Sequence, residues 1–212
     1  ESFWSRYRVE VRAKNEVLAI DARQRLVKVR NLKTGEEYNE SYDYLILSPG
    51  AYPFVPPIAG SNAGMFLHLH DIPDMDAIIA HIRCHQVQEA VVIGGGFIGV
   101  EIAENLVELG VKTHLVEMLN QVMLPFDPEM ANIIHARLAE RGVCLHLSDS
   151  VREVVGDKTG KVILDSGTEL KAGLVVSAVG VRPAVKLAQA ADLKIGATGG
   201  IFVNECMQTS DP

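Results

Sequence analysis

The sequence predicts an α/β fold in which helices and a small antiparallel meander cover a parallel sheet. Three observations support this prediction. From residue 90 onward strand-like and helix-like segments alternate, the strands are continuous apolar runs, and a glycine-rich turn joins the first strand to the first helix. The length of 212 residues suits one large domain, or one domain and part of another.

Before residue 60 we expect short strands and then a linker. Apolar residues recur with strand periodicity in three runs, residues 8–12, 17–20 and 26–29. A fourth run, residues 44–47, predicts a buried strand that stops at Ser48. Three prolines within residues 53–57 exclude a helix or a central strand there, so this stretch is the best domain boundary.

The alternation that defines the fold follows the linker. We expect strands at residues 90–93, 114–116, 143–147 and 174–178, and helices at residues 74–85, 98–109 and 127–141. Asp127 and Pro128 supply an N-cap and a first-turn proline for the last of these helices. Residues 151–170 predict an antiparallel meander with turns at 156–160 and 165–167.

Composition excludes several classes of protein. A hydrophobic fraction of 48% can bury a sizeable core, which argues against disorder. The net charge of −7 argues against nucleic acid and anionic membrane as partners, and no apolar run approaches the roughly 20 residues that cross a bilayer. Cys84, Cys144 and Cys206 are too scattered for a disulfide framework, so we expect a cytoplasmic protein.

The glycine-rich turn predicts a dinucleotide-binding site. Its residues are Gly94, Gly95, Gly96, Phe97, Ile98 and Gly99. They match G-x-G-x-x-G: the first glycine allows the tight turn, the second lets the backbone approach a pyrophosphate, and the third lets helix and strand pack closely. The helix N-terminus then presents N–H groups and partial positive charge to the phosphates. This context favours a Rossmann-like fold over a glycine-rich turn without a ligand.

Glu117 predicts which cofactor binds. It ends the second strand, 18 residues after Gly99, where a ribose-binding carboxylate belongs. A carboxylate accepts hydrogen bonds from the ribose hydroxyls and repels a 2′-phosphate, and residues 118–121 contain no Arg or Lys to offset that repulsion. We therefore expect NAD rather than NADP.

Two further segments share a pattern that resembles a known family. Residues 45–53 and 175–183 are each an apolar strand that ends in a small residue, any residue and glycine, with proline three positions later. They resemble the crossover motifs of the FAD- and NAD-dependent pyridine nucleotide-disulfide oxidoreductases, and residues 94–104 resemble the nicotinamide fingerprint of that family. Residues 207–212 resemble the start of its second FAD motif. In style the sequence is most similar to the single-cysteine subgroup of coenzyme A-disulfide reductases and NADH oxidases.

The sequence also departs from the family pattern. No G-x-G-x-x-G for FAD precedes residue 94, and no cysteine occupies the redox position. We also expect the family's carboxy-terminal dimerisation domain to be missing from this sequence. Ala184 replaces the asparagine common after the second crossover proline. We therefore expect a fragment, with a partial FAD-binding domain at residues 1–56, an NAD-binding domain at 57–183 and a truncated return into the FAD domain at 184–212.

The resemblance implies roles for particular positions. Phe97 would cover the flavin until nicotinamide displaces it, and Glu101 would face the junction of flavin and nicotinamide. Val179 and Gly180 would border the nicotinamide. The positions implied to line FAD are Val17, Ser48, Pro49, Gly50 and Arg182. Without a ligand role, Phe97 is a packing residue and Glu101 a solvated helix acid.

The resemblance implies that the intact enzyme passes hydride from NADH to FAD and then reduces a disulfide such as coenzyme A disulfide, a polysulfide or oxygen. Its partners would be a small-molecule disulfide or thiol and, in the full-length enzyme, a second copy of the chain. No catalytic residue of this segment is implied. The alternatives are a non-catalytic NADH-binding module and a flavin-free dehydrogenase, for which we find no catalytic pair.

Other polar residues suggest weaker hypotheses. His81, Cys84 and His85 at helical spacing, with His68 and His70 nearby, permit a metal site, but a surface helix is the better interpretation, and we expect no metal. Cys144 alternates with Val143 and Leu145, which predicts a core position.

Overall fold

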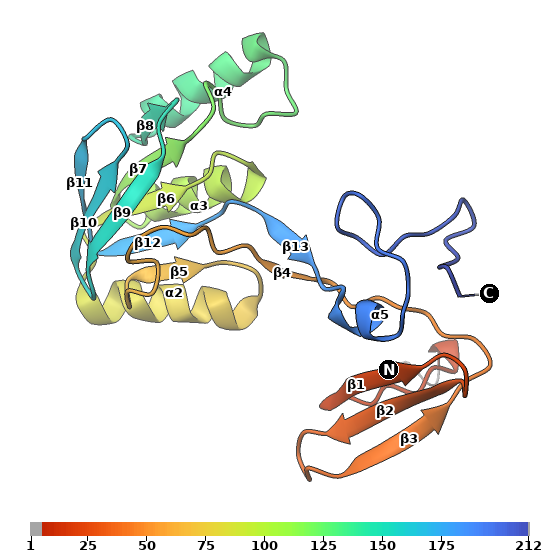
Figure 1. Cartoon of the computed structure of the whole chain (residues 1–212). Helices are drawn as coiled ribbons and strands as arrows, with labels where there is room; N and C mark the ends of the chain where they lie inside the picture. The colour runs from red at the N-terminus through yellow and green to blue at the C-terminus, as the bar shows by residue number, and fades with distance from the viewer. Residues whose placement is uncertain (1–5, 212) are drawn as a thin grey trace. The chain divides into compact units, whose positions relative to one another are not determined.

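The computed structural model describes residues 6–211, and it divides into two compact units (Figure 1). Unit 1 comprises residues 1–51 and 182–212, and unit 2 comprises residues 52–181. Pro212, the last residue of the segment that resembles the start of the second FAD motif, lies outside the described residues. Each unit is described by itself below.

Unit 2 is built on a five-stranded sheet in which all neighbouring strands are parallel, as the sequence predicts. The strand order is β5-β12-β6-β7-β8. The strands are β5 (Phe66–His68), β6 (Glu89–Ile93), β7 (Lys112–Glu117), β8 (Cys144–Leu147) and β12 (Leu174–Ser177). Because β6 lies between β12 and β7, Ile93 is in register with Ser177 on one side and Val116 on the other. The carboxyl ends of three neighbouring strands therefore meet at one edge.

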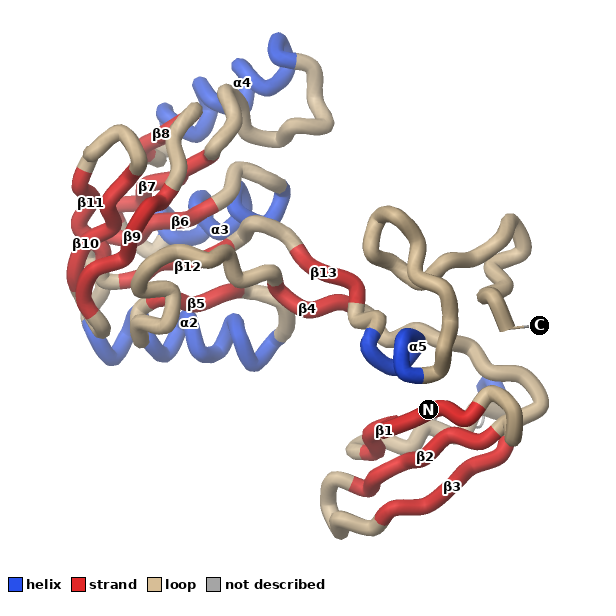
Figure 2. Tube along the Cα trace, viewed as in Figure 1, coloured by secondary structure: helices blue, strands red, loops and turns tan. Residues whose placement is uncertain are grey.

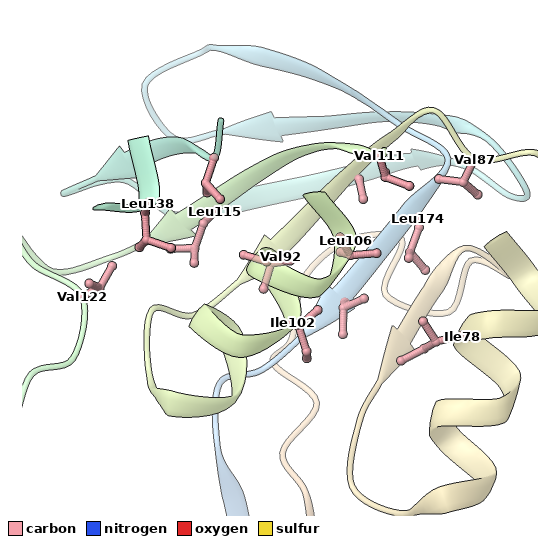
Figure 3. Packing of buried hydrophobic residues seen from close by; sticks show 14 of the residues in the cluster. Ile78, Val87, Val92, Ile102, Leu106, Val111, Leu115, Val122, Leu138 and Leu174 are labelled. Atoms are coloured by element: carbon pink, nitrogen blue, oxygen red, sulfur yellow. The ribbon is translucent and has the colours of Figure 1, made fainter. Parts of the chain in front are cut away.

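Helices cover one face of this sheet and a meander covers the other (Figures 1 and 2). The helices are α2 (Ile72–His85), α3 (Phe97–Glu108) and α4 (Pro128–Glu140). Side chains of the helices and the sheet form a buried cluster that includes Val92, Leu115 and Leu174 (Figure 3). The antiparallel meander consists of β9 (Val151–Gly156), β10 (Gly160–Leu164) and β11 (Glu169–Ala172). It buries a second cluster against the other face of the sheet, with Val91 and Val175 on the sheet side.

Unit 1 contains an antiparallel sheet and little other regular structure (Figure 2). Its sheet is β1 (Asn15–Asp21), β2 (Leu26–Asn31) and β3 (Glu37–Ser41), and α5 (Lys186–Ala190) is a short helix of the same unit. Where the chain passes between the units, β4 (Ala51–Pro53) pairs with β13 (Val181–Pro183). Strands expected at residues 17–20 and 26–29 are therefore present as β1 and β2.

Two strands expected in unit 1 are absent from the described structure. Residues 8–12 and 44–47 have no strand assignment, and Tyr44 and Ile46 are 95% and 89% exposed. The prediction of a buried strand at 44–47 is therefore wrong for this chain. A strand needs hydrogen-bonding neighbours, and no strand among residues 6–211 pairs with this run.

Two local predictions in unit 2 also need correction. Cys144 is exposed rather than buried in the core, because it lies on β8, the edge strand of the sheet. Asp127 does occupy the N-cap position of α4, but its side chain makes no capping hydrogen bond. No helix in the described part of the chain is long and apolar enough to span a bilayer.

Candidate nucleotide-binding site

The turn between β6 and α3 is shaped by close backbone contacts at its first and last glycines. Gly94 has a φ of +103°, and a Cβ there would lie 2.7 Å from the Ala178 carbonyl oxygen. A Cβ on Gly99 would overlap the carbonyl oxygen of Gly94. Both positions therefore require glycine for the chain to fold into this turn.

Gly96 differs from these two glycines. It is the N-cap of α3, with an ordinary extended backbone (φ −75°, ψ −175°). Apart from its two chain neighbours, no atom of the described residues lies within 4 Å of a Cβ built on it. Neither backbone strain nor packing therefore requires a glycine at this position. A missing side chain here keeps the space in front of the helix N-terminus open.

The N-terminus of α3 has the properties of an anion-binding site. No side chain caps it, and its first turn contains no acidic residue. The orphan N–H groups and the positive end of the helix dipole are thus available to an anionic group. Phe97 and Ile98, in the first turn, are 61% and 46% exposed, so they leave this end accessible.

Glu117 binds the turn directly. Its Oε2 accepts a hydrogen bond from the Gly95 N–H at 2.6 Å, and its Oε1 accepts one from the Leu119 N–H at 2.8 Å. The carboxylate is half-buried at the carboxyl end of β7. Each carboxylate oxygen has a second lone pair, so the group can still accept hydrogen bonds from a sugar hydroxyl.

The remaining predicted residues of unit 2 lie beside or just beyond this edge. Glu101 is exposed on α3, in its second turn. Val179 and Gly180 follow the end of β12. Ala178, the first residue after this strand, donates a hydrogen bond from its N–H to the Ile93 carbonyl at 2.8 Å. Gly180 has a φ of +96°, and its carbonyl accepts a hydrogen bond from Phe54 N–H at 3.0 Å. The fingerprint, Glu117 and the β12 exit therefore share one end of the parallel sheet.

In unit 1 three of the five predicted residues line one apolar cavity of about 220 Å³. Val17, Ser48 and Pro49 contribute to its wall. The other lining residues are Ile20, Val27, Leu45, Ile46, Leu47, Leu187, Ala188 and Ile201. Gly50 and Arg182 do not line it; Gly50 is exposed, with a φ of +72°, and its carbonyl accepts a hydrogen bond from the Ala184 N–H at 3.0 Å.

The sequence did not predict the contacts that the loop after Glu117 makes with the glycine-rich turn. The loop's Met123 N–H donates to the Gly95 carbonyl at 2.7 Å, and its Phe126 ring makes an edge contact with Phe97, at 6.2 Å between centroids. Nothing in the sequence of residues 118–126 indicates these two contacts, which become visible only in the folded chain.

Two histidines of α2 have hydrogen-bond partners on the backbone. His81 Nε2 lies 2.8 Å from the Gly173 carbonyl, and His85 Nδ1 lies 3.1 Å from the His81 carbonyl. His70, Asp71 and Asp74 bring ligand atoms within 4.8 Å of one another, a group that the sequence interpretation did not include. Asp71 and Asp74 form the capping box of α2, which accounts for their positions.

Comparison with known proteins identifies the family. The sequence pattern of the pyridine nucleotide-disulphide oxidoreductases matches residues 4–212, almost the whole chain. The chain belongs to this family. The resemblance inferred from the crossover motifs and the fingerprint is thus confirmed, as is the α/β fold class.

Individual relatives have two related activities in their names. An NADH oxidase of Methanocaldococcus jannaschii is 35% identical over 205 residues, which cover 96% of this chain and 45% of that protein. A coenzyme A disulfide reductase of Staphylococcus aureus is 31% identical over 212 residues, covering 100% of this chain and 47% of the relative. The chain thus spans about half the length of these relatives.

A solved structure supports the fold in detail. The reduced CoADR-RHD of Bacillus anthracis superposes with a TM-score of 0.94 at 43% sequence identity. The match covers 99% of this chain and 38% of that protein.

Proposed function

We propose that unit 2 binds NADH, with the pyrophosphate at the N-terminus of α3 and the adenine ribose at Glu117. The observation that carries this proposal is Gly96. Its backbone is ordinary and its surroundings are empty, so folding does not require a glycine there. A phosphate that approaches the uncapped N–H groups does require it, because any side chain would occupy that approach.

Glu117 supports NADH over NADPH. A negative charge at the end of β7 repels a 2′-phosphate, and residues 118–121 supply no cation to compensate it. Phe97, Ile98, Glu101, Val179 and Gly180 would form the path from this end of the sheet toward the nicotinamide. Their exposure and position at the carboxyl edge are compatible with that role.

The residues of unit 1 fit only part of a FAD site. Val17, Ser48 and Pro49 offer one apolar wall, with Gly50 and Arg182 as further proposed contacts. A cavity of about 220 Å³ without a phosphate-binding glycine turn in residues 1–93 is not a complete site for a dinucleotide. We therefore expect this chain alone to bind NADH and not FAD.

In the whole protein, we propose, this segment presents NADH to FAD in a flavin-dependent oxidoreductase. FAD, when bound, supplies two-electron transfer from NADH to the final acceptor. The names of the relatives support a small-molecule disulfide such as coenzyme A disulfide, or oxygen, as that acceptor. The protein's task in this segment is to bind and orient the nicotinamide. A cytoplasmic homodimer is the proposed setting.

Isothermal titration of the 212-residue chain with NADH, NADPH and FAD tests the proposal. We expect saturable NADH binding, weaker NADPH binding and no FAD binding. Gly96→Val should abolish NADH binding while the circular dichroism of the folded unit is retained. Gly200→Val is the matched control, because that glycine also has open space around a Cβ and no positive φ, but lies in unit 1. FAD binding without NADH binding, or unchanged NADH binding in Gly96→Val, would overturn the proposal.

A further inference from the structure

The loop of residues 118–127 holds one side of the fingerprint turn. The Met123 N–H donates a hydrogen bond to the Gly95 carbonyl at 2.7 Å, and the Gly95 N–H donates one to Glu117 Oε2 at 2.6 Å. The Val122 side chain packs on Gly95 so closely that a Cβ there would lie 2.8 Å from Val122 Cγ1. The position of the Gly95 peptide therefore depends on where Val122 and Met123 lie.

This loop is held in a strained conformation at the point of contact. Met123 has a φ of +54°, in the left-handed region that a residue with a Cβ rarely adopts. Such a conformation costs about 1–3 kcal/mol and persists only where surrounding contacts fix it. Val122 and Met123 are both buried, so the contacts that fix them come from the protein rather than from water.

His135 supplies one of these contacts. It lies half-buried on α4, and its Nε2 accepts a hydrogen bond from the Val122 N–H at 3.1 Å. Val122 is only 1% exposed, so its N–H has no water to replace a lost acceptor. An unsatisfied buried N–H is costly enough to move the loop instead.

From these contacts we propose that His135 is a positioning residue for dinucleotide binding. It acts through Val122 and Met123 on the Gly95 peptide, and so sets the turn that receives the pyrophosphate. The inference rests on the proposed NADH site, but it assigns to α4 a role that neither the glycine pattern nor Glu117 requires. His135 itself is not proposed to touch the nucleotide.

Two substitutions of His135 separate the hydrogen bond from the bulk of the side chain. His135→Leu keeps an apolar side chain of similar reach and removes the acceptor. His135→Gln restores an acceptor near the position of Nε2. We expect the NADH dissociation constant of the 212-residue chain to rise about tenfold in His135→Leu and to stay within about twofold of wild type in His135→Gln. Amide exchange at Val122 should accelerate in His135→Leu alone.

Leu164→Ala is the matched control for simple destabilisation. Leu164 on β10 is fully buried, and it belongs to the cluster on the other face of the sheet, apart from Val122 and Met123. At a temperature where all variants are folded, Leu164→Ala should lower the unfolding midpoint and leave NADH affinity unchanged. An equal loss of affinity in Leu164→Ala, or wild-type affinity in His135→Leu, overturns the role of His135 while the NADH site stands. If the wild-type chain does not bind NADH, both proposals fail.

Discussion

Two apolar runs with similar sequences lie in opposite environments in the two units. Residues 91–93 of unit 2 are buried, and their strand is hydrogen-bonded to β12 on one side and β7 on the other. Residues 45–47 of unit 1 are as apolar, yet Ile46 is 89% exposed and no strand among residues 6–211 pairs with the run. An apolar run therefore becomes a buried strand only where neighbours complete its ladder.

The same contrast holds for the units as wholes. Among the described residues, the buried hydrophobic side chains of unit 1 are Val29 and Ala188, while unit 2 has a cluster on each face of its sheet. The hydrophobic contribution to the free energy of folding scales with the apolar area that is removed from water, so most of this contribution belongs to unit 2. The proposed NADH site lies in that unit, whereas the proposed FAD contacts lie in the other.

The largest difference should appear in amide hydrogen exchange. Exchange at residues 91–93 requires opening of the central sheet of unit 2, whereas residues 45–47 pair with no strand of the described chain. We expect exchange at least about a thousandfold slower at 91–93. The measurement is made by mass spectrometry or NMR on a sample verified as monomeric. Equal protection of the two runs in a monomer would contradict the comparison.

Truncation of one side chain in each unit should reproduce the contrast in stability. Leu115 on β7 is fully buried in the cluster between the helices and the sheet, so Leu115→Ala should cost about 2–5 kcal/mol. Ile46→Ala should change stability by less than about 0.5 kcal/mol, because the side chain is already 89% exposed. Urea unfolding followed by circular dichroism at 222 nm reports on α2, α3 and α4 of unit 2, and amide exchange of β1, β2 and β3 at increasing urea concentration reports on unit 1. A loss of stability in Ile46→Ala as large as that in Leu115→Ala would refute the proposed difference between the two units.

What the sequence could predict follows from the same physics. The helices and four of the five parallel strands of unit 2 were predictable because their signals are local: the apolar period, the glycine turn and Pro128. The three-residue edge strand β5 was not predicted. The placement of Gly94, Gly99 and Glu117 at one edge follows from the strand–turn–helix context. These features depend only on residues close together in the chain.

The predictions that failed depend on contacts between residues that are far apart in the sequence. Residues 44–47 have the local pattern of a strand, but the pairing that would bury them does not exist in the described chain. Cys144 alternates like a core residue, but β8 is an edge strand and leaves it exposed. The bond between His135 and Val122 joins residues of a helix and an irregular loop, and no spacing in the sequence marks it.

Removal of the Glu117 carboxylate should affect unit 2 alone. Glu117→Ala removes the proposed ribose contact and the acceptor of the Gly95 N–H hydrogen bond. NADH binding should therefore weaken by about 1.5–3 kcal/mol, and the difference in affinity between NADH and NADPH should become smaller. Titration calorimetry measures both affinities. Glu37→Ala is the control, since Glu37 pairs with Lys28 and Arg30 in unit 1 and should leave NADH affinity unchanged. Undiminished NADH affinity in Glu117→Ala would mean that other residues bind the ribose.

The smallest effect we expect is a pH dependence that belongs to unit 2. His114 Nδ1 on β7 lies 3.0 Å from His146 Nε2 on β8. Burial, followed by the nearby His146 and Lys112, holds the pKa of His114 below its ordinary value of 6.5, although the Glu89 carboxylate opposes this shift. Burial likewise lowers the pKa of His146, against the opposing effect of Asp149.

These lowered pKa values fix the sign of the pH effect. Below about pH 6.5 the unfolded chain takes up protons that the folded unit binds less readily, so stability is complete above that pH and falls as the pH decreases. The urea midpoint at 222 nm should therefore be lower at pH 5.5 than at pH 7.5. His146→Gln should flatten this dependence, because one of the two imidazoles no longer titrates and the repulsion on His114 is relieved. A midpoint that rises as the pH falls, or a His146→Gln profile parallel to wild type, would show that the pair is not the source. Because His114 and His146 join β7 to the edge strand β8, this measurement tests how firmly the edge of unit 2 is held.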